Sequence, residues 1–181
     1  EYERIYLFDI GNIRSSKLRD VRFDWKESKI FMGKNTVSKV AFGRTVEEEY
    51  KNNLRHLSDL LEGNTGILFT SRPHEEVMEY FNNLSHPEFA VAGNIPDTTV
   101  SLDAGLTSFP VSMLDQLRTW GMIVEVDDGK VVLREPICVA TAGEPLTPSQ
   151  AKILEKLGKK VATFRIQLLC KWEDGEFEPL Q

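Results

Sequence analysis

Between Gly33 and Arg44 the chain gathers the residue types that proteins use to hold phosphate groups. Gly33 permits close approach of a backbone, and Lys34 and Asn35 then open a segment with helical spacing. The first N–H groups of a helix attract anions, and lysine and arginine side chains neutralise phosphates. The stretch therefore predicts a site that faces a polyanion.

The candidate phosphate contacts fall in three parts of the chain. One part follows the first predicted strand, at the carboxyl end where α/β sheets commonly bind ligands. Lys29 extends the set if its side chain points out of the second strand, and Asn35 either caps a helix or hydrogen-bonds to a sugar or base. The full candidate set is Arg14, Ser15, Ser16, Lys17, Lys29, Gly33, Lys34, Asn35, Thr36, Lys39 and Arg44.

Charge is distributed unevenly along the sequence. Residues 11–44 hold nine Lys/Arg and three Asp/Glu, which gives a net charge of +6 (9 − 3). The whole chain carries −6, so the remainder carries −12 (−6 − 6). Such asymmetry favours a patch that binds a polyanion, and nucleic acid is the first candidate. The alternative is a solvated helix face, and Arg19 and Arg22 fit both interpretations equally well.

Strand and helix patterns alternate around these residues. Short apolar runs predict strands at residues 5–10, 30–32 and 66–69. Helical spacing predicts a helix that buries Leu18 and another over residues 47–61. This alternation predicts an α/β (α+β) fold, with a mixed sheet flanked by helices.

Several apolar residues near the basic stretch are interpreted as core. The basic helix places Val37, Val40 and Ala41 on one side. Trp25 and Phe31 both fall at apolar-periodic positions, which favours core packing over a role as platforms for base stacking.

The pattern changes after Gly93. A strand at 98–102 and a helix at 111–120 are followed by a hairpin around Asp127-Asp128-Gly129. A capping box, Thr147-Pro148-Ser149-Gln150, then starts a further helix.

One long strand is predicted after this module, over residues 161–172. A strand that returns after a self-contained module indicates an insertion. We therefore predict one domain from residues 1–93 plus 161–181 and an inserted domain at 94–160. The predicted core of the inserted domain contains Leu106, Phe109, Met113 and Leu114.

Composition excludes several classes of protein. No apolar run approaches the roughly 18–20 residues that a membrane helix needs, and no signal-peptide pattern follows Glu1. Cys138 and Cys170 lie in apolar, strand-like stretches and are predicted to be reduced core residues. Neither forms a metal-ligand spacing with a histidine, so no metal or cofactor is expected.

Two functions of other classes are alternatives to nucleic-acid binding. Asp9 follows a buried strand, as in a phosphohydrolase, but the second aspartate expected two residues later is replaced by Gly11. Gly33-Lys34 also lacks the upstream glycine of a Walker loop, so we do not expect an enzyme. A pure protein-interaction module would leave the +6 segment without a purpose.

Several motifs together resemble one family. The sequence is similar to the stalk-base acidic ribosomal protein P-zero, of the ribosomal protein L10 family, at Gly33-Lys34-Asn35-Thr36, Asn64-Thr65-Gly66-Ile67-Leu68-Phe69-Thr70, Ala92-Gly93 and Thr99-Val100. It resembles more closely the mRNA turnover protein 4 family of ribosome assembly factors. The segments concerned are Asn12 to Arg22, Phe42-Gly43-Arg44 and Glu49-Tyr50-Lys51-Asn52-Asn53-Leu54.

This resemblance implies a function and a set of partners. It implies a ribosome biogenesis factor that binds large-subunit rRNA at the stalk base of the pre-60S particle until P-zero replaces it. It also implies a neighbouring ribosomal protein of the L-eleven type (L-twelve in yeast naming), a phosphatase-like release factor, and a monomer off the ribosome. The implied location is the nucleolus and nucleus, with shuttling to the cytoplasm. A truncated P-zero is the alternative within the same family.

Overall fold

The structure is a computed structural model that describes residues 1–11 and 17–180. The chain forms two compact units. The first comprises the described parts of residues 1–86 together with 164–180, and the second comprises Pro87–Thr163. The insertion predicted at residues 94–160 falls within the second unit, and the chain leaves the first unit once and returns to it.

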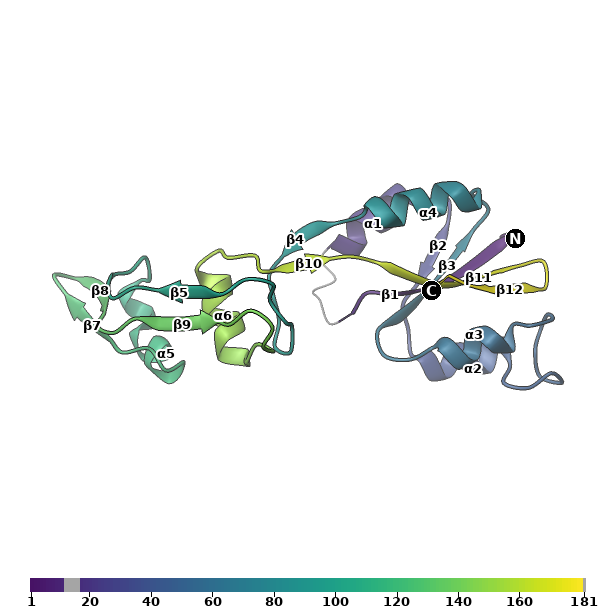
Figure 1. Cartoon of the computed structure of the whole chain (residues 1–181). Helices are drawn as coiled ribbons and strands as arrows, with labels where there is room; N and C mark the ends of the chain where they lie inside the picture. Colours follow the sequence, from purple (N-terminus) through teal and green to yellow (C-terminus); the bar gives the residue numbers. More distant parts are fainter. Residues whose placement is uncertain (12–16, 181) are drawn as a thin grey trace. The chain divides into compact units, whose positions relative to one another are not determined.

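A five-stranded sheet forms the centre of the first unit (Figure 1). In spatial order its strands are β12 (Glu176–Pro179), β11 (Gln167–Glu173), β1 (Arg4–Asp9), β3 (Thr65–Thr70) and β2 (Lys29–Phe31). All neighbouring strands are antiparallel, so the expected mixed sheet is antiparallel throughout. The α+β class is as predicted, and β2 forms one edge of the sheet.

Helices cover both faces of this sheet (Figure 1). The helices α1 (Leu18–Asp24) and α4 (His74–Asn83) cover one face, and α2 (Asn35–Phe42) and α3 (Arg55–Leu60) cover the other. Because side chains alternate along a strand, β1 serves both faces. Ile5 and Leu7 belong to the cluster that contains Leu57 of α3. On the opposite face, the Tyr6 hydroxyl hydrogen-bonds to His74 of α4 at 3.0 Å.

Trp25 lies at the centre of the α1–α4 layer. Its side chain is buried, and its ring contacts those of Tyr80 and Phe81 of α4 at centroid distances of 5.3 and 5.4 Å. The prediction that Trp25 is a core residue is therefore confirmed. Leu18 and Val21, at helical spacing on α1, are buried in the same way.

The single helix predicted over residues 47–61 does not form. Residues 45–54 make turns, and the helix α3 begins only at Arg55. Asn53 has a positive φ of 65°, which a continuous helix does not allow. The Glu49 carboxylate accepts a hydrogen bond from the Arg55 amide at 3.2 Å, so it satisfies an N–H at the start of α3. Tyr50, predicted to be buried, is consequently exposed.

The second unit contains short strands and two α-helices in its described residues. Its strands are β5 (Val100–Leu102), β6 (Gly105–Leu106), β7 (Val124–Asp127), β8 (Lys130–Leu133) and β9 (Ile137–Ala140). Its helices are a 3-10 turn η2 (Val111–Met113), α5 (Leu114–Thr119) and α6 (Pro148–Lys156). The strands β4 (His86–Glu88) and β10 (Ala162–Phe164) pair with each other. The long strand predicted over 161–172 is thus two strands, β10 and β11, interrupted at residues 165–166.

Two local signals in the second unit are confirmed. The hairpin β7–β8 turns through Asp128 and Gly129, both with positive φ (46° and 72°), as a tight two-residue hairpin requires. The capping box of α6 is complete, because Thr147 and Gln150 each accept a hydrogen bond from the other's amide.

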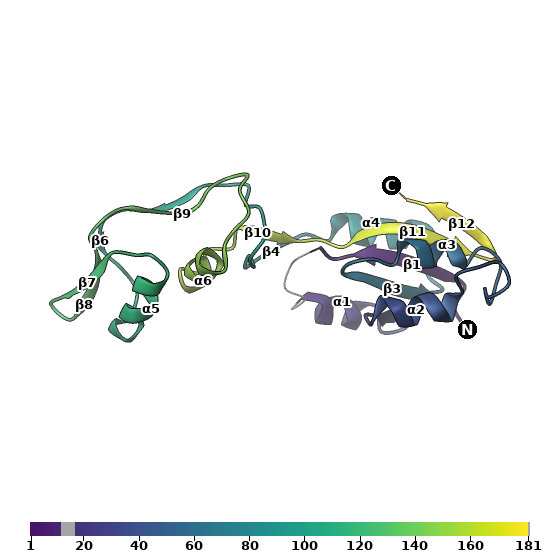
Figure 2. The ribbon, with the colours of Figure 1, turned by 90° about the horizontal axis from the view of Figure 1, so that it is seen from below.

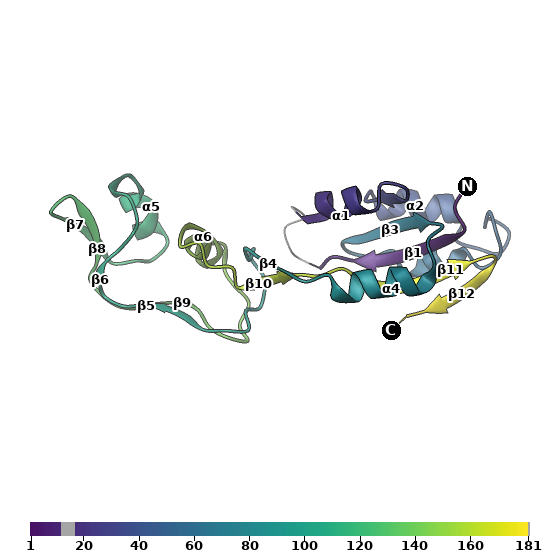
Figure 3. The same ribbon diagram turned by 90° about the horizontal axis from the view of Figure 1, so that it is seen from above.

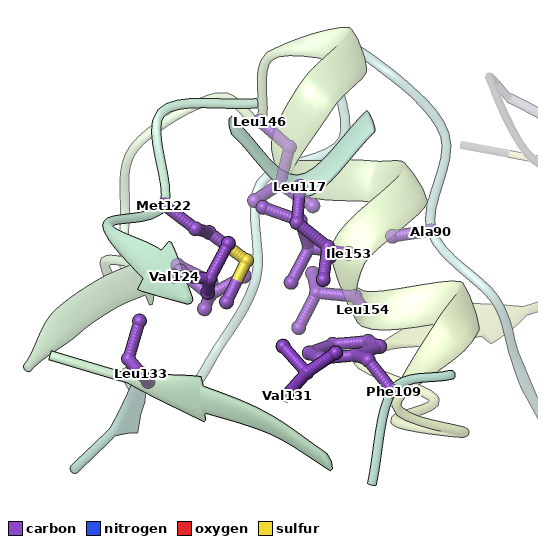
Figure 4. Packing of buried hydrophobic residues seen from close by; sticks show 12 residues of the cluster. Ala90, Phe109, Leu117, Met122, Val124, Val131, Leu133, Leu146, Ile153 and Leu154 are labelled. Atoms are coloured by element: carbon purple, nitrogen blue, oxygen red, sulfur yellow. The ribbon is translucent and has the colours of Figure 1, made fainter. Parts of the chain in front are cut away.

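The core of the second unit joins α5 and α6 to the strands (Figure 4). Phe109, Leu117, Val131 and Leu154 are buried in it, and Met113 and Leu114 pack at its border. Leu106 is exposed, so its assignment to this core is wrong. Short two- and three-stranded sheets leave one face of such strands open to water.

The two cysteines differ in environment. Cys170 is buried on β11, and this burial raises the pKa of its thiol to about 12. Cys138 is exposed on β9, so the prediction of a core residue is wrong there. The side chains of a sheet alternate between faces, and Cys138 falls on the open one.

Candidate RNA interface

The first turn of α2 is open to a ligand. Lys34 is its N-cap residue, with an extended backbone, and makes no capping hydrogen bond with its side chain. The amides of Val37 and Ser38 bond to the Lys34 carbonyl. Within the described part of the chain, the amides of Asn35 and Thr36 have no hydrogen-bond partner. These N–H groups carry the positive end of the helix dipole.

Asn35 fixes the position of this helix start. It is the first residue of α2 rather than its cap, and its Nδ2 donates a hydrogen bond to the Gly63 carbonyl at 3.1 Å. The capping alternative for Asn35 is therefore wrong. Gly63 precedes β3, so Asn35 ties α2 to the central sheet and leaves its Oδ1 as the atom that can accept from RNA.

Several predicted residues line one polar recess between α2 and α3. It measures about 490 Å³, and its lining consists of Asn35, Thr36, Lys39, Arg44, Ser58, Asp59 and Leu61. Four of these were predicted from sequence, and Ser58 was not. The Ser58 hydroxyl donates to the Gly43 carbonyl at 2.7 Å, which locks the end of α2 to α3. A small polar residue between apolar helix positions was its only sequence signal.

Gly43 sets the direction of the chain after α2. Its φ is +88°, and a Cβ at this position would lie 2.5 Å from the backbone of Glu49. Only glycine fits both conditions. The next amide, that of Arg44, donates to the Glu48 carboxylate at 3.3 Å. The turn thereby places Arg44 beside the recess with its guanidinium exposed.

Basic side chains gather around the β2 edge of the sheet. Figures 2 and 3 show α1 and α2, which precede and follow β2, at the same edge of the first unit. We call the described cations of this region the basic edge: Lys17, Arg19, Arg22, Lys26, Lys29, Lys34, Lys39 and Arg44. Within the described residues, Lys17 alone among them has an ion pair, with Asp20 at 3.4 Å. Arg14, Ser15 and Ser16 lie outside the described residues.

The apolar residues of this edge are less buried than predicted. Phe31 is 43% exposed, so the prediction that it belongs to the core is wrong. Val37 and Val40 are 60% and 67% exposed, because α2 turns Ser38 and Phe42 toward the sheet instead. Phe31 lies on the outermost strand, where no further strand covers its side chain.

Gly33 has a packing role that sequence reasoning did not predict. A Cβ on Gly33 would lie 2.6 and 2.7 Å from two ring carbons of Phe31. The ring of Phe31 therefore folds over Gly33 and uses the space that a side chain would fill. Gly33 remains exposed on its other side, where a ligand can approach the backbone.

The features expected of an enzyme do not come together around Asp9. Its carboxylate accepts a hydrogen bond from the Gly11 amide at 2.9 Å, which accounts for it as a turn residue. The described residues hold no cluster of His, Cys, Asp and Glu suited to a metal ion. No helix among them is long and apolar enough to cross a membrane.

Comparison with known proteins identifies the family. The Ribosomal protein L10 family matches residues 1–86, and the insertion domain in 60S ribosomal proteins of the L10 type matches residues 90–158. Ribosome assembly factor mrt4 of Dictyostelium discoideum is 33% identical over 178 residues, covering 98% of this chain and 80% of that protein. The chain belongs to the mrt4 family of ribosome assembly factors.

Other members show the same relationship. Ribosome assembly factor mrt4 of Schizosaccharomyces pombe is 34% identical over 181 residues, covering 93% of this chain and 75% of that protein. Large ribosomal subunit protein uL10 of Thermococcus sibiricus is 27% identical, and this chain covers only 52% of it. The higher identity and coverage favour the mrt4 family over a truncated P-zero. The family consists of assembly and ribosomal proteins and not of enzymes, in agreement with the expectation from Asp9.

Proposed function

We propose that this chain binds large-subunit rRNA at the stalk base of the pre-60S particle and holds that site until P-zero replaces it. The observation that carries the proposal is the uncapped start of α2, which stands among unpaired cations in an otherwise acidic chain. Its relatives are named ribosome assembly factors, and they align along almost the whole chain.

The proposed contacts are made mainly to phosphates and sugars. The free amides of Asn35 and Thr36 would hold one phosphate at the positive end of the helix. Lys34, Lys39 and Arg44 would neutralise neighbouring phosphates. Because folded RNA is recognised largely through its shape, its phosphates and its 2′-hydroxyls, this arrangement suits a folded rRNA site.

The remaining parts of the proposal concern the partners and the location. We propose that the neighbouring L-eleven type ribosomal protein lies beside the chain on the rRNA, and that a phosphatase-like release factor promotes its departure. The site of action would be the nucleolus and nucleus, with shuttling to the cytoplasm. Competition with P-zero for one rRNA site is the direct consequence.

A binding experiment with the large-subunit rRNA stalk-base fragment tests this function. The dissociation constant is measured over a range of salt concentrations for the wild-type chain, Lys34→Glu and Lys130→Glu. Lys130 is a matched control, since it is an exposed lysine on the β7–β8 hairpin. Lys34→Glu should weaken binding about tenfold or more, because a charged contact contributes about 1.5–3 kcal/mol.

The salt dependence gives a second readout. Loss of one phosphate contact lowers the slope of log K against log salt by about one unit. Excess P-zero should displace the wild-type chain from the fragment. Binding that is insensitive to salt, or equal losses in Lys34→Glu and Lys130→Glu, would count against the proposal.

A further inference from the structure

Three aromatic residues form a shelf beside the basic edge. We call Tyr2, Phe31 and Phe69 the aromatic shelf. The rings of Tyr2 and Phe69 lie 6.2 Å apart between centroids. Phe69 and Phe31 lie on adjacent strands, where Phe69 pairs with Lys29 and Phe31 pairs with Ile67. All three line one apolar groove of about 350 Å³, a volume within the usual range of ligand pockets.

The shelf lies among positive charges. Lys29 is two residues from Phe31 on the same strand, so both side chains point to the same face, and Lys29 lines the groove as well. Gly33 and Lys34 continue directly from the strand into the open start of α2. A cation in the groove and another beside the helix start match the phosphates that flank a nucleotide.

The shape of Phe31 is preserved by its neighbour. Its ring occupies the space above Gly33, where a Cβ would come within 2.6 Å of it. An exposed phenylalanine on an edge strand has little packing to hold it, and this contact fixes the ring beside the phosphate site. A flat, partly exposed ring flanked by cations is how single-stranded nucleic acid is held through its bases.

We propose that Phe31 is a stacking platform for an unpaired base of the RNA bound by the basic edge. The inference rests on the proposed function and adds to it a base contact that the phosphate contacts do not supply. Lys29 and Lys34 contact the phosphates on either side of the stacked base, and Gly33 is a positioning residue that holds the ring of Phe31.

Three phenylalanine variants test the stacking on the rRNA stalk-base fragment. Phe31→Tyr keeps an aromatic face and should bind within about twofold of wild type. Phe31→Leu keeps apolar volume but removes the ring, and binding should weaken about 5- to 150-fold, the loss expected for one stacked base. Phe177→Leu, on the opposite edge strand β12, is the matched control and should have no effect.

The salt slope separates stacking from charge. Phe31→Leu should lower affinity without changing the slope, whereas Lys34→Glu lowers both. If Lys34→Glu weakens binding but Phe31→Leu does not, the stacking proposal is overturned and the proposed function stands. The groove would then be open to an apolar protein partner instead. A wild-type chain that does not bind the fragment overturns both.

A double-mutant cycle tests the role of Gly33. Gly33→Ala should displace the ring and weaken binding in the wild-type background, since its new Cβ meets the ring atoms. In the Phe31→Leu background, which lacks those atoms, Gly33→Ala should have little further effect. Additive losses would show that Gly33 acts without Phe31 and would overturn the positioning role. Thermal unfolding of each variant confirms that the fold is retained.

Discussion

Gly43 shows how a single residue shapes the candidate site. Its backbone is left-handed, and the backbone of Glu49 passes where a side chain would begin. The end of α2, the turn to Arg44 and the bond from Ser58 all depend on this close approach. The basic edge is therefore positioned partly by a residue that has no side chain to offer a ligand.

We expect Gly43→Ala to destabilise the first unit more than Gly63→Ala does. Both glycines have positive φ, which costs an L-residue roughly 1–2 kcal/mol. Gly63 has open space around it, while at Gly43 the added Cβ also meets backbone at 2.5 Å. Urea unfolding of the two variants measures the difference. Equal losses would show that the turn after α2 can shift to accept a side chain.

Glu49 makes the start of α3 sensitive to pH. Burial acts to raise the pKa of its carboxyl, but hydrogen bonds from the Arg55 and Asn53 amides and the Arg55 guanidinium outweigh it and lower that pKa. The folded pKa lies below the ordinary value of 4.5. The stabilisation is therefore complete above pH 4.5 and is lost as the pH falls through the folded pKa.

Glu49→Gln should consequently be less stable than wild type at neutral pH and should approach it in acid. Glu62→Gln is the control, because Glu62 is exposed and its side chain has no ion pair within the described residues. The free energy of unfolding is measured by urea titration across the acid range. A constant difference between Glu49→Gln and wild type at every pH would contradict this assignment.

At the scale of elements, the best determined helix is α6. Its first turn is satisfied by the capping box, and its buried face supplies Ile153 and Leu154 to the second unit. The contrast with α2 is informative. In α2 the helix start is uncapped and two valines are exposed, which are features of a surface that binds something rather than of a core.

Thr147→Ala should lower the stability of the second unit by about 1 kcal/mol, the usual value of a lost N-cap. Thr98→Ala is the control, since Thr98 is exposed and has no hydrogen bond in the described part of the chain. Hydrogen exchange of the α6 amides locates the effect, and unfolding measures its size. Equal losses in both variants would mean that the capping box contributes nothing measurable.

At the scale of the whole molecule, the position of charge matters more than its sum. The chain is acidic overall, so binding to RNA requires that cations be concentrated on one surface. The basic edge meets this condition, because seven of its cations form no ion pair within the described residues. The acidic remainder would keep other faces of the molecule away from the RNA.

We predict that a larger charge change elsewhere affects RNA binding less. The double variant Lys152→Glu/Lys156→Glu on α6 changes the net charge by −4, whereas Lys34→Glu changes it by −2. Binding to the stalk-base fragment at a fixed salt concentration compares them. Lys34→Glu should lose more affinity, because direct phosphate contacts act at short range and distant charges are screened. A greater loss in the double variant would place RNA contacts on α6.

Local signals in the sequence predicted much of the fold. Turn and cap residues act over a few positions, so the Asp128–Gly129 hairpin and the Thr147 capping box were predicted correctly. Helical periodicity correctly placed Trp25 in the core. The same periodicity failed for Phe31, because a strand pattern carries no information on whether a neighbouring strand covers it.

By itself, the sequence determined the family, the α+β class, the basic character of residues 11–44 and the candidate cations. Only the tertiary structure decided that β2 is an edge strand, that α2 exposes Val37 and Val40, and that Phe31 lies over Gly33. The physical reason is that charge and turn chemistry belong to neighbouring residues. Burial depends instead on strand order and on contacts between residues far apart in the chain.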